Sequence, residues 1–538
     1  MLQPDPADKG REDVPVLATS HLAQALALLH AGELDAAECL GAEALRANPG
    51  DADALHLVGI VRLRQGRPVE ALDPVAAALR AEPRSTAFLC THGQVLAALG
   101  RHEEALESYG KSLDLAPDPA GTIAALHQRA RSLAALGRTQ AAISDLDRLL
   151  AIAPAHAVAL NDRGLALRRL QRPAEALASY ELAIAAQPGF AEALNNRGVT
   201  LLDLGRPQEA LASVIAAQAA RPDYADARRN EGLIRLMLGD FAAGWPKYEW
   251  RWKSRSDWPP MQLPVWDGHS ELAGKTLLLH AEQGFGDTVQ FVRYVAALAS
   301  RGARVVLGVP PALKTLLARV DGVAAVVSQG DPMPPVDLQY PMASLPLAFA
   351  TDLDTIPLNI PYLSVRDEET SRWCERLPQG RPRVGLVWSG SRTHTNDHNR
   401  SLRLRQLAPL LQLLQHAGMT FVGLQQDIRE IDLADLRGWP AALALGREFR
   451  DFTDTAAIVS LLDLVVCVDT SVAHLAGALG RPVWVLLPFV PDWRWLLDRD
   501  DSPWYPTARL FRQPRLGDWD SVVARLCAEL TRFARPAA

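Results

Sequence analysis

Apolar residues in the first half of the chain recur at three- and four-residue spacing, the pattern that gives a helix one apolar face. Pairs of such segments repeat with a period of about 34 residues. A small residue marks the same place in the first segment of a pair, at Gly59, Gly93, Gly164, Gly198 and Gly232. It is needed because two antiparallel helices must approach closely. The first half is therefore predicted to be a stack of helix pairs.

Other positions of the period identify the type of repeat. In the sixth unit Gly205 marks the turn between the helices, Ala210 lies early in the second helix, and Pro222 ends that helix. This combination is identified as the tetratricopeptide repeat. We expect six full repeats and a degenerate seventh. Such repeats form an α-solenoid, a superhelix whose concave groove usually binds peptide.

One column of polar side chains follows the predicted groove. Two positions before the small residue of the first helix, successive units carry Gln128, Asp162, Asn196 and Asn230. This column resembles the asparagine ladder of the repeat-containing protein O-GlcNAc transferases. The resemblance implies that these side chains hold the backbone of an extended peptide, a role that suits groups with both donors and acceptors. The alternative is that they only cap or bridge neighbouring helices.

The second half alternates short apolar, β-branched runs with helical segments. Runs of this composition are buried on both faces, which is typical of parallel sheets covered by helices. They occupy residues 276–280, 304–309, 324–328, 384–388, 420–424, 464–468 and 483–487. Two α/β halves of this kind place a ligand cleft at the carboxyl ends of their strands.

These patterns together predict an α-solenoid followed by two Rossmann-like lobes. A segment rich in Pro and Trp follows the repeats, and a Pro-containing break separates the lobes. The predicted divisions are a tail 1–17, the repeats 18–252, a linker 253–274, the first lobe 275–360, an interlobe linker 361–382 and the second lobe 383–538.

A glycine-rich loop follows the first predicted strand. Its residues Gln283, Gly284 and Gly286 permit a tight turn into a helix that we expect to begin near Thr288. Asp287 then lies at the helix N-terminus, where the helix dipole favours an ionised carboxylate. The alternative is a capping aspartate without a catalytic role.

A second polar loop follows the strand 464–468. Asp469, Thr470 and Ser471 come directly before a predicted helix, so hydroxyls and backbone N–H groups form an anion site suited to a diphosphate. His474 lies one turn into that helix and faces roughly the same way. For His474 the alternative is an interior histidine with its hydrogen bonds satisfied.

A third polar segment opens from the strand 384–388 with Ser389 and Gly390. It contains Arg400, which we expect to bind the diphosphate, because a guanidinium group forms bidentate contacts with phosphate oxygens. The alternative is a solvated surface loop.

The loops together resemble the bacterial, heptosyltransferase-like glycosyltransferase family 9, over roughly residues 275–530. The resemblance implies a GT-B fold, with the acceptor on the first lobe and the donor on the second, and metal-independent, inverting transfer from a nucleotide sugar. It implies that Asp287 is the general base and that Asp469, Thr470, Ser471 and His474 bind the donor. One residue departs from the family, because Gln425 stands where many members place a glutamate for the ribose.

Composition excludes several other classes of protein. The net charge of −6 gives no basic surface for nucleic acid. The 5 cysteines are never spaced as C-x-x-C, so neither a zinc site nor a disulfide framework is expected. No apolar run has the length of a signal peptide or a membrane span, which favours a cytoplasmic protein. We expect no metal and no cofactor besides the nucleotide sugar, whose identity the sequence does not give.

The sequence therefore predicts a nucleotide-sugar-dependent glycosyltransferase that modifies a protein or peptide held by the repeats. Flagellin or another surface protein is the acceptor that we consider first. Two alternatives stay open. In the first, the acceptor is a lipid-linked or cell-surface saccharide. In the second, the second half is a degenerate domain on a non-catalytic scaffold.

Overall fold

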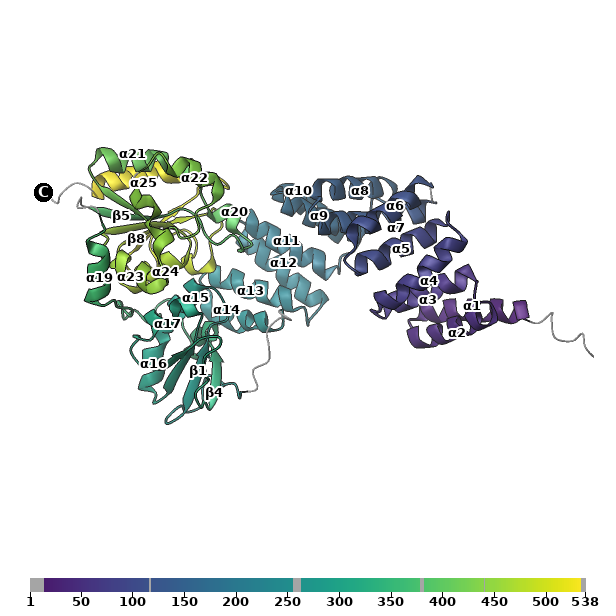
Figure 1. Ribbon diagram of the computed structural model, residues 1–538, viewed down its shortest axis with the longest axis horizontal. Coiled ribbons are helices and arrows are strands. Elements are labelled where there is room, and N and C mark those ends of the chain that lie inside the picture. Colours follow the sequence, from purple (N-terminus) through teal and green to yellow (C-terminus); the bar gives the residue numbers. More distant parts are fainter. Residues whose placement is uncertain (1–13, 116–117, 255–262, 378–381, 440, 534–538) are drawn as a thin grey trace, which may run out of the picture. The chain divides into compact units, whose positions relative to one another are not determined.

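The computed structural model describes residues 14–115, 118–254, 263–377, 382–439 and 441–533 (Figure 1). The chain divides into two compact units, Met1–Thr200 and Leu201–Ala538. Residues 1–13 of the predicted tail and parts of both predicted linkers lie outside the described residues, whereas residues 14–17 belong to the first helix. The division falls inside the sixth predicted repeat, so the last repeats belong to the same unit as the two lobes.

The first unit consists of antiparallel helix pairs. Its helices are α1 (Val14–Ala31), α2 (Leu34–Ala47), α3 (Ala52–Arg64), α4 (Pro68–Ala81), α5 (Thr86–Ala98), α6 (His102–Asp114), α7 (Pro119–Ala135), α8 (Thr139–Ile152), α9 (Ala157–Arg169), α10 (Pro173–Ala186) and the start of α11 (Ala191–Asp203). A Cβ added at Gly93 or Gly164 would lie 2.5 Å from the ring of Tyr109 or Tyr180 on the second helix of the pair. The small residues are thus required by close packing, and the predicted α-solenoid is confirmed.

The second unit begins with the last repeats, α12 (Pro207–Ala220), α13 (Ala225–Met237) and α14 (Phe241–Tyr248), followed by the turn η1 (Glu249–Trp252). The seventh repeat shares a hydrophobic core with the lobes. Phe241 and Trp245 are buried in that core, and the indole of Trp245 donates a hydrogen bond to the carbonyl of Thr351 at 2.8 Å. The repeat pattern dissolves here because these side chains pack against the lobes instead of a further repeat.

The first lobe has a parallel sheet of order β3-β2-β1-β4. Its elements are β1 (Thr276–His280), α15 (Phe285–Phe291), η2 (Val292–Tyr294), α16 (Val295–Ser300), β2 (Arg304–Gly308), α17 (Pro311–Leu317), β3 (Val323–Val327), β4 (Leu338–Pro341), η3 (Met342–Ser344) and α18 (Leu345–Ala348). In the central strand Leu278 pairs with Val306 on one side and with Gln339 on the other. The carboxyl end of β1 leads directly into the predicted glycine-rich loop.

The second lobe has a parallel sheet of order β6-β5-β7-β8-β9. Its strands are β5 (Arg383–Val387), β6 (Thr420–Gly423), β7 (Leu464–Val468), β8 (Val483–Leu487) and β9 (Ala508–Arg512). Its helical elements, with α19 before the first strand, are α19 (Asp367–Cys374), α20 (Asp397–Arg400), η4 (Leu404–Leu407), α21 (Ala408–His416), α22 (Glu430–Leu436), η5 (Ala441–Glu448), α23 (Phe452–Ser460), α24 (Ser471–Ala478), η6 (Trp493–Trp495) and α25 (Trp519–Phe533).

Helices cover both faces of this second sheet, α21 and α25 on one face and α23 and α24 on the other (Figure 1). Every residue of β5, β7 and β8 is buried as a result. The prediction of two Rossmann-like lobes is confirmed.

Some details of the predicted elements were wrong. The strands β4 and β9 were not predicted, because Gln339, Pro341 and the two arginines of β9 interrupt the apolar pattern. The helix α15 begins at Phe285, not near Thr288. Gly286 lies inside that helix, and a neighbouring helix leaves no room for a side chain at this position.

Candidate functional site

The loop after β1 places Asp287 in the first turn of α15. One carboxylate oxygen, Oδ2, accepts a hydrogen bond from the backbone N–H of Gly284 at 2.8 Å. The other, Oδ1, forms an ion pair with Arg494 from the second lobe. The side chain of Asp287 is 22 % exposed. A group that was predicted from the first lobe alone is therefore held by both lobes.

The same loop is anchored by the end of the seventh repeat. The amide of Gln283 donates a hydrogen bond to the hydroxyl of Tyr248 at 2.6 Å, so Gln283 holds the loop in place. Arg251 donates to Oε1 of Glu282 from Nε at 3.1 Å and from Nη2 at 2.7 Å. Burial raises the pKa of Glu282 to about 7, against the opposing effect of Arg251.

The two lobes meet at α15 and α24. A Cβ added at Gly286 would lie 2.7 Å from Cδ2 of His474 and 3.4 Å from Cα of Ser471. Beside this contact the rings of Phe285 and Phe452 stand 5.1 Å apart, edge to face. The structure thus brings the glycine-rich loop and the second polar loop together.

The second polar loop forms the N-terminus of α24. The hydroxyl oxygen of Thr470 accepts a hydrogen bond from the N–H of Val472 at 3.2 Å and caps the helix, and Ser471 is half-buried beside it. The side chain of Asp469 is half-buried. The loss of surrounding water, together with the nearby charge of Asp492, raises the pKa of Asp469 to about 6.

His474 lies within the contact between the lobes. Its Nδ1 is hydrogen-bonded to the hydroxyl of Tyr505 at 3.0 Å, and its ring stacks on Trp495 with centroids 5.5 Å apart. Burial, reinforced by the charges of Arg494 and Arg293, lowers the pKa of His474 well below its usual value. It is therefore a neutral imidazole at physiological pH, fixed by its neighbours.

The segment after β5 lies against the second polar loop. Arg400 donates a hydrogen bond from Nη1 to the carbonyl of Asp469 at 3.0 Å and covers Gly390, where a Cβ would lie 2.6 Å from Nη2. Two buried atoms of this segment, Nε of Arg400 and the hydroxyl of Ser389, have no hydrogen-bond partner among the described residues. Unpaired buried donors of this kind are costly and call for a ligand or water.

Gln425 supports the segment after β5 through hydrogen bonds. Its Oε1 accepts a hydrogen bond from the N–H of Ser389 at 3.1 Å, and its Nε2 donates to the carbonyl of Asp427 at 3.1 Å. Gln425 is buried, so both ends of its amide shape the loop.

Arg494 was missed by the sequence interpretation. Its Nε donates to Oε1 of Gln290 at 2.6 Å and its Nη1 to Oδ1 of Asp492 at 2.9 Å. The available signal was its place between two tryptophans in the loop after β8, at the same sheet edge as the other two loops of the second lobe.

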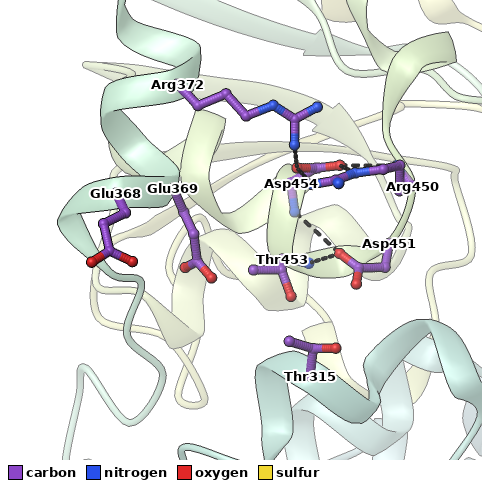
Figure 2. A pocket seen from close by; sticks show the side chains of 8 residues that line it. All are labelled: Thr315, Glu368, Glu369, Arg372, Arg450, Asp451, Thr453 and Asp454. Carbon is purple, nitrogen blue, oxygen red and sulfur yellow. Dashed lines mark hydrogen bonds and ion pairs between the residues drawn. The ribbon is translucent and has the colours of Figure 1, made fainter.

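A further cavity of about 340 Å³ lies between α17, α19 and the start of α23 (Figure 2). Most of its charges are already paired. Asp454 accepts hydrogen bonds from Arg450 and Trp373, and Glu369 forms two with Arg319. The hydroxyl of Thr453 is buried there without a partner among the described residues.

The polar column of the solenoid connects neighbouring repeats. Oδ2 of Asp162 is hydrogen-bonded to Nε2 of His127 at 2.9 Å. The amide of Asn196 donates to Oδ1 of Asn161 at 2.9 Å. In each case the partner comes from the preceding repeat. Gln128 of this column is half-buried, and Asn230, in the second unit, is also half-buried.

Neither a metal cluster nor a membrane span is found in the described ranges. No group of three or more His, Cys, Asp or Glu side chains there is arranged to hold a metal ion. Within the same ranges, no helix has the length and apolar character to cross a bilayer. All five cysteines are described, and none forms a disulfide.

Comparison with sequence families agrees with this architecture. Tetratricopeptide-repeat families match residues 22–86, 84–155, 127–190 and 195–247. Glycosyltransferase family 9 (heptosyltransferase) matches residues 347–486. The chain thus contains tetratricopeptide repeats and a glycosyltransferase family 9 domain. The family 9 match includes Arg400 and the loop 469–474, whereas Asp287 lies before it.

Two curated relatives match part of the chain. The chain is 27% identical to Protein FlbA of Caulobacter vibrioides over 333 residues, 56% of this chain and 54% of FlbA. It is 32% identical over 133 residues to the DnaJ homolog subfamily C member 7 homolog of Schizosaccharomyces pombe, 22% of this chain and 28% of that protein. The chain therefore spans about half the length of FlbA and less of the second relative.

Two solved structures match part of the chain. YrrB, described as a TPR protein with an unusual peptide-binding site, is 21% identical with a TM-score of 0.29, and the match covers 35% of this chain and 95% of YrrB. The pilF protein of Pseudomonas aeruginosa is 16% identical with a TM-score of 0.36, and the match covers 40% of this chain and 97% of pilF.

Proposed function

We propose that the chain is a GT-B glycosyltransferase that transfers a sugar from a nucleotide sugar, with inversion and without a metal ion, to a protein held by its repeats. The observation that carries this proposal is the pair of unpartnered buried donors at Ser389 and Arg400, beside the N-terminus of α24. That helix packs against α15, which carries Asp287. The family 9 match supports the reaction class.

On the donor side, the diphosphate of the nucleotide sugar binds at the start of α24. The N–H groups of that helix and the guanidinium of Arg400 stabilise its negative charge, and Ser389 donates a further hydrogen bond. In this proposal fixed donors replace a metal ion in stabilising the leaving nucleotide.

On the acceptor side, Asp287 acts as general base. The acceptor hydroxyl attacks the anomeric carbon from the face opposite the phosphate and gives its proton to Asp287. The bond between the anomeric carbon and the phosphate oxygen breaks, and the nucleotide leaves with the electron pair. This displacement inverts the anomeric configuration.

The acceptor is proposed to be a protein because a saccharide acceptor would not need a solenoid. Serine or threonine hydroxyls are the expected acceptor groups, with flagellin or another surface protein as the first candidate. The side chains proposed to contact the bound peptide are those of Gln128, Asp162, Asn196 and Asn230. Five unpaired thiols fit a reducing compartment, and we place the reaction in the cytoplasm.

The test is calorimetric titration of the full chain with UDP-, GDP-, ADP-, dTDP- and CMP-sugars. The full chain is used because the seventh repeat shares a core with the lobes. We expect one nucleotide class to bind, and Arg400→Ala to weaken that binding by roughly tenfold or more. The matched control is Arg515→Ala, whose side chain is 83% exposed and pairs with Asp518.

The same samples distinguish the remaining alternatives. Asp287→Asn is expected to keep donor binding and lose turnover. Turnover with a lipid-linked or free saccharide, and none with protein, would assign the acceptor to the saccharide class. Absence of binding across the whole panel would reject the enzymatic proposal and leave a scaffold.

A further inference from the structure

Three consecutive residues of η6 contact three different parts of the second unit. Trp493 packs edge to face on Trp245 of the seventh repeat, with ring centroids 5.2 Å apart. Trp495 stacks on His474 of α24. Between them, Arg494 points to α15 of the first lobe, where it contacts Asp287 and Gln290. The turn therefore joins the repeat, the donor-side helix and the acceptor-side helix.

The guanidinium of Arg494 has little freedom to move. Its Nε, Nη1 and Nη2 each donate a hydrogen bond, to Gln290, Asp492 and Asp287 respectively. The group also lies over the ring of Trp493, 4.3 Å from its centroid, and the residue is 6% exposed. A planar guanidinium group whose three nitrogens all donate hydrogen bonds holds its partners in a defined geometry.

Backbone geometry at this turn is also unusual. Leu496, the next residue, has φ 54° and ψ −166° although it is not glycine, and its side chain is buried. A buried leucine in this region is strained, and such strain persists where the surrounding contacts fix the conformation. The conformation of the turn is therefore fixed by the contacts that η6 makes with the seventh repeat, α15 and α24.

Asp287 receives one hydrogen bond from each lobe. Gly284 of its own loop donates to Oδ2, and Arg494 of the other lobe binds Oδ1. The first contact fixes the side chain within α15. The second is present only while the second lobe lies against that helix, so the orientation of the carboxylate depends on both lobes.

We propose that Arg494 is the positioning residue of the general base, which it orients across the contact between the lobes. The inference rests on the proposed function, since it takes Asp287 as the base. It places the correct alignment of the base under the control of the second lobe, the part that binds the donor. A base misplaced by about 1 Å loses on the order of a hundredfold in rate.

The first measurement does not depend on activity. Hydrogen exchange of the backbone amides of residues 284–291 is compared in the full chain, in Arg494→Ala and in Arg494→Lys. We expect at least roughly tenfold faster exchange in Arg494→Ala, because a buried charged contact of α15 is lost. Amides of β5 and of α9 should not change. Unchanged exchange in residues 284–291 would overturn the inference.

The second measurement separates positioning from donor binding. With the nucleotide sugar that the calorimetric panel identifies, Arg494→Ala should lower kcat by about a hundredfold and change KM for that sugar nucleotide by less than about twofold. Added guanidinium ion should restore part of kcat in Arg494→Ala, and Arg494→Lys should retain part of it. Arg515→Ala should behave as the unchanged chain.

The possible failures differ in their meaning. A raised KM with unchanged kcat would assign Arg494 to donor binding and overturn the positioning role. If the unchanged chain turns over no nucleotide sugar, the proposed function fails, whereas the exchange measurement still decides whether Arg494 holds the loop of Asp287.

Discussion

The backbone of Gly286 in the first lobe lies against the imidazole of His474 in the second lobe, with space for a hydrogen atom but not for a methyl group. This contact sets the distance between the glycine-rich loop and the second polar loop. It also explains why glycine is needed at a position whose backbone is helical. The requirement is space, because the conformation itself would accept any residue.

Gly286→Ala tests this requirement. The added Cβ would lie 2.7 Å from His474 Cδ2, so α15 and α24 must move apart. We expect the free energy of unfolding of the second unit to fall by about 1–3 kcal/mol, as for other overpacked contacts. Thermal unfolding followed by circular dichroism measures the change, and the midpoint for the second unit should decrease.

A glycine elsewhere in the second unit is the matched control. A Cβ at Gly438 would meet the carbonyl of Asp435 at 3.5 Å, an ordinary contact. Gly438→Ala should therefore change the midpoint little. If both variants behaved alike, the close approach at Gly286 would not limit the packing of the lobes.

The elements that the sequence predicted best are those whose stability is local or fully apolar. The bounds predicted for β1 and β7 agree with the structure, since each is an uninterrupted apolar run between polar loops. The strand β4 escaped prediction because Gln339 lies in it. That side chain is accommodated by a hydrogen bond to the carbonyl of Leu263, 76 positions away, which no local pattern reveals.

The loops of the candidate site could be predicted because each follows a strand, but their partners could not. Arg494 lies 207 positions from Asp287 in the chain. Only the packing of α15 on the second lobe brings them together. His474 and Gln425 were chosen by motif and register, whereas their hydrogen bonds to Tyr505 and Ser389 depend on how the loops fold over the sheet.

The turn between α9 and α10 offers a stabilising substitution. Gln171 has φ 60°, at a position where neighbouring repeats have glycine, such as Gly137 with φ 73°. A side chain in this left-handed region costs about 1 kcal/mol relative to glycine. Gln171→Gly should therefore raise the stability of the first unit by roughly 0.5–1 kcal/mol, partly offset by the entropy of the unfolded chain. Urea unfolding of the full chain, followed in the first transition assigned to the repeats, measures it.

The reverse substitution checks the cause. A Cβ at Gly137 would meet no atom within 4 Å, so Gly137→Ala changes only the backbone preference. It should lower the stability of the first unit by about 1 kcal/mol. Destabilisation by Gln171→Gly would show that the glutamine side chain makes a contact that outweighs its backbone strain.

Asn196 tests whether the polar column serves the fold or a bound peptide. Its amide donates to Asn161, which is 5% exposed, so Asn196→Ala leaves a buried acceptor without that partner. We expect a loss of about 1–3 kcal/mol in the first unit, and recovery of part of it when Asn161→Leu is added. Gln128→Ala, at the same register in an earlier repeat, is compared with Asn196→Ala in the stability of the first unit and in peptide binding. Unchanged stability in Asn196→Ala, with weaker peptide binding, would favour the peptide-holding role.

Glu282 should make the stability of the second unit depend on pH. Burial raises the pKa of Glu282 from its usual value of about 4.5 to about 7, while Arg251 opposes the shift and the charges of Glu249 and Asp287 add to it. A carboxyl whose pKa is raised on folding binds its proton more tightly in the folded state. Its contribution is complete below about pH 4.5 and is lost as the pH rises towards 7. The loss is at most roughly 3 kcal/mol.

Glu282→Gln removes this titration but keeps an acceptor for Arg251. Between pH 4.5 and 7.5 the thermal midpoint of the variant, relative to the unchanged chain, should therefore increase with pH. Glu369→Gln is the control of opposite sign, because hydrogen bonds from Arg319 lower the pKa of Glu369. Its contribution is complete above the unfolded pKa of about 4.5 and is lost only as the pH falls below that value. The relative midpoint of that variant should therefore stay level between pH 4.5 and 7.5 and rise only below pH 4.5. Parallel midpoint curves for Glu282→Gln and the unchanged chain would mean that Glu282 remains ionised in the folded protein, balanced by Arg251.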